Sequence, residues 1–481
     1  MNNQVTSQGL VALRSPAHEQ GVNRLRLLLV MSACFACVAL DNTKLVAALP
    51  TLARVSEMSP VLERWTVEAG LLVYASLLIL GGSLSERFGP RRVLLLGLAG
   101  FGLASIAGAF STSAYQLIGA RALSGVATAC LTPATLATLK HSFDDRARPM
   151  AIAVWTASFG LGAALGPVLA GLLVTRGGLS AVQLANLPPI ALCAWGSSRL
   201  VPRDLPRHDL PLDFRGAALC LAAAACSLFA LLSGPSHGWL APAVVASALA
   251  GLGFSLGAWR WLRRARHPLF DLSLFAQGRF SQALLVILLG YFAFSGVSFV
   301  IAQYLQLGRA RAALHAGLLT LPLASSLLVG TLLAPRSMMR WGAERALWIS
   351  LCAALSGIGL LAWASYGTSD LVLCVALVPF GGGCGSAFAN ATELILGLVT
   401  PQRAATAAAL SESAFEFGGV LGIAVLSTVL GGAVSTPNHI AELAPRAFWG
   451  AAVAVLLALL VAIRLSRSAA PRITPNVCSD P

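Results

Sequence analysis

The chain has 481 residues, of which 57% are apolar and only 11% are charged, and its mean hydropathy is +0.78. Soluble globular folds cannot hide this much apolar surface, so the sequence requires lipid as its solvent. A net charge of +14 would indicate a nucleic-acid partner in a soluble protein, so the placement of the charges decides between the two interpretations.

The basic residues follow the segments between the apolar stretches. If the N-terminus is cytoplasmic, most of the 33 Lys and Arg lie on the cytoplasmic side, and only Lys44 and Arg121 lie within apolar stretches. This asymmetry predicts a multi-pass protein of the cell inner (cytoplasmic) membrane with both termini in the cytoplasm. Because no basic face is left over, we expect no nucleic-acid partner.

Fourteen stretches fit membrane-spanning helices of about 20 residues. The run from Gly216 to Trp259 carries no charge but is too long for one span, and its segment Gly234 to Gly238 predicts a turn between two helices. In chain order, the expected spans are 27 to 50, 66 to 85, 92 to 112, 114 to 139, 149 to 174, 182 to 198, 216 to 233, 240 to 259, 280 to 304, 313 to 334, 346 to 366, 371 to 396, 404 to 433 and 446 to 464.

An internal repeat predicts two related bundles. Gly162 and Gly166 in the fifth span recur as Gly418 and Gly422 in the thirteenth, which indicates two six-helix halves with two further helices inserted between them. The fold class is therefore an all-α polytopic membrane protein. Its expected parts are an N-terminal cytoplasmic arm (1–26), a six-helix bundle (27–198), a linker (199–215), two inserted helices (216–259), a cytoplasmic loop (260–279), a second six-helix bundle (280–465) and a cytoplasmic tail (466–481).

Several other classes of chemistry lack a signal. The ten cysteines show no disulfide framework and no metal-ligand spacing, and we expect Cys34 and Cys37 to be small packing residues. The polar N-terminal arm lacks a cleavage site, so the first apolar segment is expected to be a retained helix. Without a Walker A loop, the expected energy source is a proton gradient, and we expect no cofactor, no metal and no catalytic residue.

Ionisable side chains inside a bilayer are costly, so each is a candidate functional residue. Asp41 and Lys44 lie three residues apart in the first span, where they could form either a structural ion pair or one that an arriving proton breaks. Arg121 has no acidic partner on its own helix, and we expect it to face the bundle interior rather than extend outward.

Glu412 and Glu416 are one helical turn apart and leave the same face of the thirteenth span. Two carboxylates on one wall of a low-dielectric cavity repel each other, so one of them favours a proton and the pair can exchange that proton for a cation. Alternatively they reach water or Arg403 at the cytoplasmic helix end, and the same alternative holds for Glu393 near the end of the twelfth span.

These considerations define three sets of candidate residues. Gly162, Gly166, Pro167 and Gly171 give the fifth span a small-residue stripe with a bend, which suits a gate but also occurs in ordinary packing. Proton coupling is expected at Asp41, Arg121, Glu412 and Glu416. Substrate binding is expected at Asp41, Glu393, Glu412, Glu416, Trp155 and Tyr304.

Four motifs together resemble the major facilitator superfamily, in particular its 14-helix drug:proton antiporter branch. They are Gly82 to Arg91 after the second span, Leu40 to Pro50 in the first, Arg121 to Gly125 in the fourth and Gly162 to Gly171 in the fifth. The resemblance covers roughly residues 27 to 465. It implies conformational roles for Gly82, Glu86, Arg87, Gly89 and Arg91, and proton transfer at Arg121.

The sequence departs from this branch at several positions. Glu86 stands where Asp is usual, Lys44 replaces an apolar residue, and residues 183 to 186 replace tryptophans. The segment Ser411 to Gly418 resembles the subset that exports quaternary ammonium compounds and dyes, in which acidic residues contact cations.

The function expected from these features is proton-driven export of a cationic or amphipathic small molecule by rocking of two bundles around a central cavity. The expected partners are the substrate, protons and the lipid bilayer, and we expect a monomer. Three alternatives stay open: export of one metabolite or antibiotic, proton-coupled uptake, and a membrane sensor or scaffold with a transporter fold.

Overall fold

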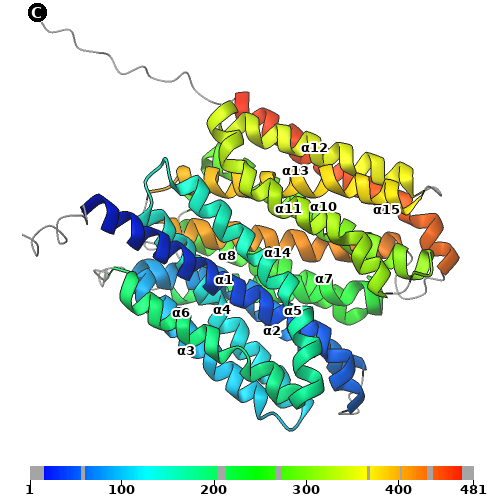
Figure 1. The fold of residues 1–481 in the computed structure, drawn as a ribbon, viewed down its shortest axis with the longest axis horizontal. Helices are drawn as coiled ribbons and strands as arrows, with labels where there is room; N and C mark the ends of the chain where they lie inside the picture. The colour runs from blue at the N-terminus through cyan, green and yellow to red at the C-terminus, as the bar shows by residue number, and fades with distance from the viewer. Residues whose placement is uncertain are drawn as a thin grey trace, which may run out of the picture.

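The computed structural model describes residues 16–55, 60–202, 213–265, 272–311, 313–365, 369–400, 403–430 and 437–467. Every regular element within these ranges is a helix, which confirms the predicted all-α class. Figure 1 shows the long helices running side by side, with the N-terminal helices in blue and cyan and the C-terminal ones in yellow to red.

The N-terminal bundle and the insert after it are built from eight helices. They are α1 (Pro16–Val55), α2 (Pro60–Phe88), α3 (Pro90–Ala109), α4 (Ala114–Ser142), α5 (Arg148–Leu184) and α6 (Leu187–Leu200), followed by α7 (Phe214–His237) and α8 (Pro242–Arg264).

The C-terminal bundle follows a short helix, α9 (Ser273–Ala276). Its elements are α10 (Gly278–Gln303), the π-helix η1 (Tyr304–Gly308), α11 (Ala313–Trp341), α12 (Ala343–Ala364), α13 (Asp370–Gly397), α14 (Ala404–Val429) and α15 (Pro437–Arg467).

Thirteen helices of the described chain are long and apolar enough to cross a membrane. The apolar part of α7, Arg215–Leu231, is shorter and corresponds to the one remaining predicted span, the seventh in chain order. Successive spans reverse direction, so α1 begins and α15 ends at the same end of the molecule, on the left in Figure 1. We call this end the terminal face.

The two bundles repeat one packing pattern. In the first, α1 packs on α5, α2 on α4 and α3 on α6; in the second, α10 packs on α14, α11 on α13 and α12 on α15. These pairs occupy equivalent places in the two chain segments, which is the arrangement that a parallel repeat produces. The fold is therefore two six-helix bundles with α7 and α8 inserted between them.

The boundary between the fifth and sixth spans falls in the expected gap between residues 174 and 182, and only the start of the sixth span, expected at 182, differs. The break in direction falls at Gly177 and Gly178, and Gly178 has a φ of 58°, a conformation that suits glycine. The sixth span accordingly begins at Arg176. Within this span the helix is interrupted at Ala185 and Asn186, between α5 and α6. Pro188 and Pro189 follow in the first turn of α6, where their missing backbone N–H groups are tolerated.

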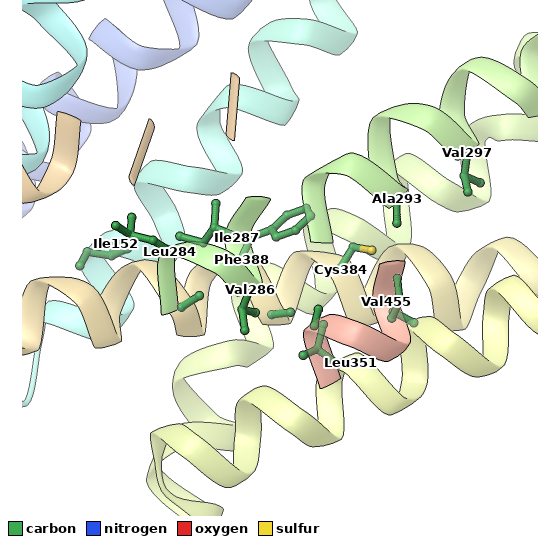
Figure 2. Close-up of a cluster of buried hydrophobic side chains, with 14 of the residues drawn as sticks. Ile152, Leu284, Val286, Ile287, Ala293, Val297, Leu351, Cys384, Phe388 and Val455 are labelled. Carbon is green, nitrogen blue, oxygen red and sulfur yellow. The ribbon is translucent and has the colours of Figure 1, made fainter. Parts of the chain in front are cut away.

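A buried apolar cluster extends through both bundles. Ile152 of α5 belongs to the same cluster as Leu284 and Ile287 of α10 and Leu351 of α12, and Val455 adds α15 (Figure 2). Helix pairs approach closely where small residues face each other, because association in lipid depends on close packing.

The insert lies against both bundles. Helix α7 packs on α2 of the first bundle and on α14 of the second. The rings of Trp65 and Phe229 stack with centroids 5.8 Å apart, and Trp239 Nε1 donates to Thr428 Oγ1 at 2.9 Å. Helix α7 therefore covers the boundary between α2 and α14.

Candidate functional site

Four buried side chains from α1, α4 and the start of α6 form a polar network in the N-terminal bundle. Arg121 Nη1 contacts Asp41 Oδ2 at 2.5 Å, whereas Lys44 Nζ lies 3.9 Å from Asp41 Oδ1. Asn186 connects the two, since its Nδ2 donates to Asp41 Oδ1 at 2.6 Å and its Oδ1 accepts from Lys44 Nζ at 2.5 Å. None of these four residues is more than 4% exposed.

The partner of Asp41 is thus on another helix. The sequence places Lys44 on the same helix as Asp41, but the carboxylate makes its closest contact with Arg121, and Lys44 reaches it through an amide. A second amide, Asn42, accepts from Arg121 Nη2 at 2.7 Å. Asn186 was not predicted as a member of the network. The only sign of it in the sequence is that a polar residue stands within an apolar segment.

The network is enclosed within one bundle. Besides Asp41, Asn186 Nδ2 also donates to Ser105 Oγ of α3 at 3.1 Å. Gly70 of α2 lies against Arg121, because a Cβ added there would be 3.1 Å from the Arg121 carbonyl oxygen and 3.3 Å from its Nη2. Helices α1, α2, α3, α4 and α6 therefore surround the ion pair, and Arg121 faces the bundle interior.

Glu412 and Glu416 lie where α14 meets the N-terminal bundle. Helix α14 packs on α10 of its own bundle and on α2 and α4 of the other. Both carboxylates interact electrostatically with Tyr74 of α2 and Tyr291 of α10, so groups from both bundles flank the pair. Glu412 is buried and Glu416 is partly exposed.

No basic side chain of the described chain forms an ion pair with either glutamate. Glu416 lies twelve residues after the first residue of α14, Ala404, which corresponds to roughly 18 Å along the helix. That depth is near the middle of a hydrocarbon core of about 30 Å. The pair is therefore an uncompensated acidic site deep between the bundles.

Aromatic rings gather next to this acidic pair. The Tyr291 ring lies 5.4 Å from that of Phe388 and 5.1 Å from that of Phe415, and Phe388 and Phe415 are 5.4 Å apart. Phe294 extends the cluster at 5.9 Å from Phe388. Faces of aromatic rings attract cations, so carboxylates and rings together make a surface suited to a positively charged organic group.

Glu393 has a different environment from the other two glutamates. Its Oε1 accepts from Arg148 Nε at 2.8 Å and from Nη2 at 2.7 Å, and both residues are less than 10% exposed. Arg148 also contacts Asp145 at 2.5 Å. Because Arg148 begins α5 and Glu393 is near the end of α13, this buried ion pair joins the two bundles at the terminal face.

A second contact joins the bundles at the same face. Glu86 at the end of α2 accepts a hydrogen bond from the backbone N–H of Thr406, in the first turn of α14, at 2.8 Å. At Gly82, one turn earlier, an added Cβ would lie 2.8 Å from the Ala405 carbonyl oxygen and from the Ala409 Cβ. Only a glycine permits this approach without displacing α14.

The remaining residues of this motif have contacts within the N-terminal bundle. Gly89 separates α2 from α3 with a φ of 90°, a conformation that glycine adopts without strain. Arg91 donates to the Ser198 carbonyl oxygen at 2.5 Å, and the Arg87 guanidinium lies 5.3 Å from the centre of the Phe88 ring.

The small-residue stripe of α5 faces α1. A Cβ added at Gly162 would collide with the backbone of Ala36, and one added at Gly166 would collide with Thr43. Pro167 and Gly171 follow on the same helix, and their surroundings lie outside the described residues. The stripe thus holds two helices of one bundle together.

Two other expected substrate-binding residues make their polar contacts with groups other than the acidic pair. Trp155 is 1% exposed, stacks on Phe35 at 3.9 Å and donates to Thr135 Oγ1. Tyr304 is in the π-helix at the end opposite the terminal face, where its hydroxyl donates to the Ser365 carbonyl oxygen at 2.9 Å. No group of three His, Cys, Asp or Glu side chains in the described part could hold a metal ion.

The protein thus has two repeated helix bundles with polar contacts between them at one end and unpaired carboxylates between them. This arrangement is that of secondary transporters. A family model described as Major Facilitator Superfamily matches residues 31–423, and the chain belongs to this superfamily. It is therefore a multi-pass membrane protein of a transporter family.

Several curated relatives align over most of the chain. The multidrug efflux pump LfrA of Mycolicibacterium smegmatis is 32% identical over 403 residues, covering 84% of this chain and 80% of its own. The puromycin resistance protein pur8 of Streptomyces alboniger is 32% identical, covering 85% and 82%. The methyl viologen resistance protein SmvA of Salmonella typhimurium is 30% identical, covering 84% and 82%.

Solved structures share the fold. The human organic anion transporter MFSD10 superposes with a TM-score of 0.69 at 20% identity, covering 91% of this chain and 99% of that one. The proton:xylose symporter XylE gives a TM-score of 0.68 at 13% identity, with coverage of 92% and 96%.

Proposed function

We propose that this protein is a proton-coupled antiporter that exports cationic or amphipathic small molecules across the cytoplasmic membrane, with both termini in the cytoplasm. The family and the relatives named for drug efflux and for resistance to puromycin and methyl viologen support export of small molecules. The observation that carries the cationic character is the acidic pair, Glu412 and Glu416, which has no basic partner among the described residues and adjoins a cluster of aromatic rings.

The exchange follows from the charge of this site. Two carboxylates in a low-dielectric space are stabilised either by a bound proton or by a bound cation, so the two compete for one site. Cargo binds from the cytoplasm or inner leaflet when the pair is ionised, and protons arriving from the other side displace it. One elementary charge moved down a membrane potential of 100 mV releases about 2.3 kcal/mol, which is enough to drive accumulation.

The other candidate residues have supporting roles in this proposal. A proton on Asp41 removes the charge that holds Arg121, so this ion pair is a second candidate proton site. Asp41 is enclosed within one bundle, and we therefore assign contact with cargo to Glu412 and Glu416. The contacts of Arg148 with Glu393 and of Glu86 with α14 hold the cytoplasmic ends of the bundles together.

Everted membrane vesicles test the proposal. Wild-type protein should accumulate ethidium when a proton gradient is imposed, and collapse of the gradient should release the dye. Glu416→Gln and Glu412→Gln should each reduce this uptake strongly, because each removes a charge that binds the cation. Glu442→Gln is the matched control, since Glu442 is exposed at the start of the last span.

Two results would overturn the assignment. Uptake by Glu416→Gln and Glu412→Gln equal to that of wild type would remove the acidic pair from the mechanism. Transport by wild type that does not respond to the gradient would exclude proton coupling altogether. Expression and membrane insertion of all variants are compared by immunoblot, so that loss of protein is not read as loss of transport.

A second candidate function is export of one specific antibiotic. It is favoured by relatives named for a single compound, such as the methylenomycin A resistance protein of Bacillus subtilis, which is 32% identical and covers 68% of this chain. A panel of structurally unrelated cations decides between the two, because a dedicated exporter should transport one member and a multidrug exporter several.

A further inference from the structure

A cavity opens at the terminal face, between the second bundle's two neighbouring helices α12 and α15. Its volume is about 540 Å³. Its walls come from the first turns of α12, with Glu344, Arg345 and Trp348, and from the last turns of α15, with Ile463 and Ser466. In Figure 1 the red end of α15 lies beside α12.

Both signs of charge line this cavity. Arg345 is exposed, and it forms no ion pair with a described residue. Glu344 is partly buried and uses its Oε1 for an ion pair with Arg279 of α10, so that Oε2 is the carboxylate oxygen left for another donor. The cavity therefore offers a cation for an anionic group and a carboxylate oxygen for a cationic one.

The cavity lies where two spans leave the hydrocarbon. The apolar spans of these helices run from Ala343 to Ala364 and from Glu442 to Ser466, so that their terminal-face ends carry its lining residues. Trp348 belongs to the residue type that accumulates at the level of lipid headgroups. Next to the cavity both helices present outward-facing apolar side chains, with Cys352 exposed on α12 and Leu456 and Leu460 44% and 53% exposed on α15.

We propose that this cavity binds the headgroup of a phospholipid that carries a primary ammonium, of the phosphatidylethanolamine type. The phosphate contacts Arg345, the ammonium donates to Glu344, and the acyl chains lie on the outward apolar residues of α12 and α15. Guanidinium and phosphate form charge-assisted hydrogen bonds, as do ammonium and carboxylate. A headgroup with a net negative charge has no ammonium to donate to Glu344, so this carboxylate adds nothing to its affinity.

Native mass spectrometry of the purified, detergent-solubilised protein tests this site. The protein is titrated with one lipid at a time, and the four probes are palmitoyl-oleoyl phosphatidylethanolamine, the corresponding phosphatidylcholine, the corresponding phosphatidylglycerol and soluble phosphoethanolamine. Phosphatidylcholine has the same phosphate but no N–H donor, so it isolates the contact with Glu344. Soluble phosphoethanolamine has the headgroup alone and isolates the contribution of the acyl chains.

Wild type should bind phosphatidylethanolamine at least about tenfold more tightly than phosphatidylcholine and phosphatidylglycerol, the ratio expected from one charge-assisted hydrogen bond. It should also bind this lipid more tightly than soluble phosphoethanolamine, which lacks the acyl chains. Arg345→Gln should lose this binding by a similar factor, and Glu344→Gln should bind the ethanolamine and choline lipids equally. Arg340→Gln, an exposed arginine at the same face outside the cavity, should behave as wild type.

Other outcomes overturn the proposal. Equal binding of the three lipids by wild type, or wild-type binding by Arg345→Gln, would exclude a headgroup site at this cavity. Preference for phosphatidylglycerol would exclude the zwitterionic ligand. Equal binding of soluble phosphoethanolamine and the lipid would exclude the contribution of α12 and α15. Thermal unfolding of each variant is measured alongside, and Arg345→Gln, which breaks no ion pair of the described chain, keeps the test valid if Glu344→Gln is unstable.

Discussion

The buried ion pair between Arg148 and Glu393 leads to a prediction about the balance of conformations. This ion pair joins the two bundles directly, and it lies at the terminal face. Glu393→Gln keeps the shape of the side chain and removes its charge. We expect the variant to spend more time with this face open, because a guanidinium that has lost its buried carboxylate partner is stabilised by access to water.

The magnitude follows from the burial of the two groups. Breaking a buried pair by removing one partner costs about 3 to 5 kcal/mol. Arg148 keeps its contact with Asp145, whose side chain is 94% exposed, and this contact offsets part of the loss. A shift of about 2 to 3 kcal/mol toward the open state is therefore expected, which corresponds to a roughly 30- to 150-fold change in the ratio of the two states.

Double electron–electron resonance measures this ratio directly. Spin labels at Arg146 and Thr400, both exposed and on opposite bundles at the terminal face, report the opening as a longer distance. Glu393→Gln should raise the long-distance population, and the charge exchange Arg148→Glu with Glu393→Arg should restore part of the short one. A distribution in Glu393→Gln identical to that of wild type would refute the idea that this pair holds the face closed.

Two further predictions concern stability. Asn186→Leu should lower the melting temperature in detergent more than Lys44→Met does. The first change leaves both the Lys44 amine and the Asp41 carboxylate without their amide partner, at about 1 to 3 kcal/mol for each buried group. Equal losses of melting temperature in the two variants would contradict the bridging role of Asn186. Gly162→Leu should prevent recovery of monodisperse protein by size-exclusion chromatography, since even a Cβ added at Gly162 collides with Ala36. Gly160→Leu should leave the protein monodisperse, because a Cβ added at Gly160 meets no atom within 4 Å.

The architecture could be predicted from the sequence because it depends on hydropathy and on repeated glycines. The spans, the insert and the two related bundles all follow from segment length and composition. The backbone reverses at Gly178, inside the expected gap between the fifth and sixth spans, where a positive φ is free of strain. The start of the sixth span was harder to place, and it begins at Arg176 rather than at residue 182.

The pairing of charged residues could not be predicted in the same way. Spacing along one helix indicates which groups can meet locally, and it correctly allowed Lys44 to approach Asp41. It cannot show that Arg121, 80 residues away, takes the closer position, nor that Glu393 faces Arg148 across the bundle boundary. Those contacts depend on how helices rotate against each other in the assembled bundles.

The aromatic cluster was missed for a related reason. Tyr291, Phe388 and Phe415 come from three helices and show no common motif, so nothing in the sequence distinguishes them from lipid-facing rings. Tyr304 was expected at the substrate site instead, whereas it lies in the π-helix at the far end.

The position of α7 restricts how the molecule can move. Any rocking motion that separates α2 from α14 must carry this helix with one bundle and slide it across the other. Leu228 of α7 packs in one buried cluster with Ala75 of α2 and Val420 of α14. The Trp65 to Phe229 stack and the Trp239 to Thr428 hydrogen bond fix the insert to α2 and to α14 respectively. Separation of α2 from α14 therefore requires the contacts of the inserted hairpin with one of the two bundles to break.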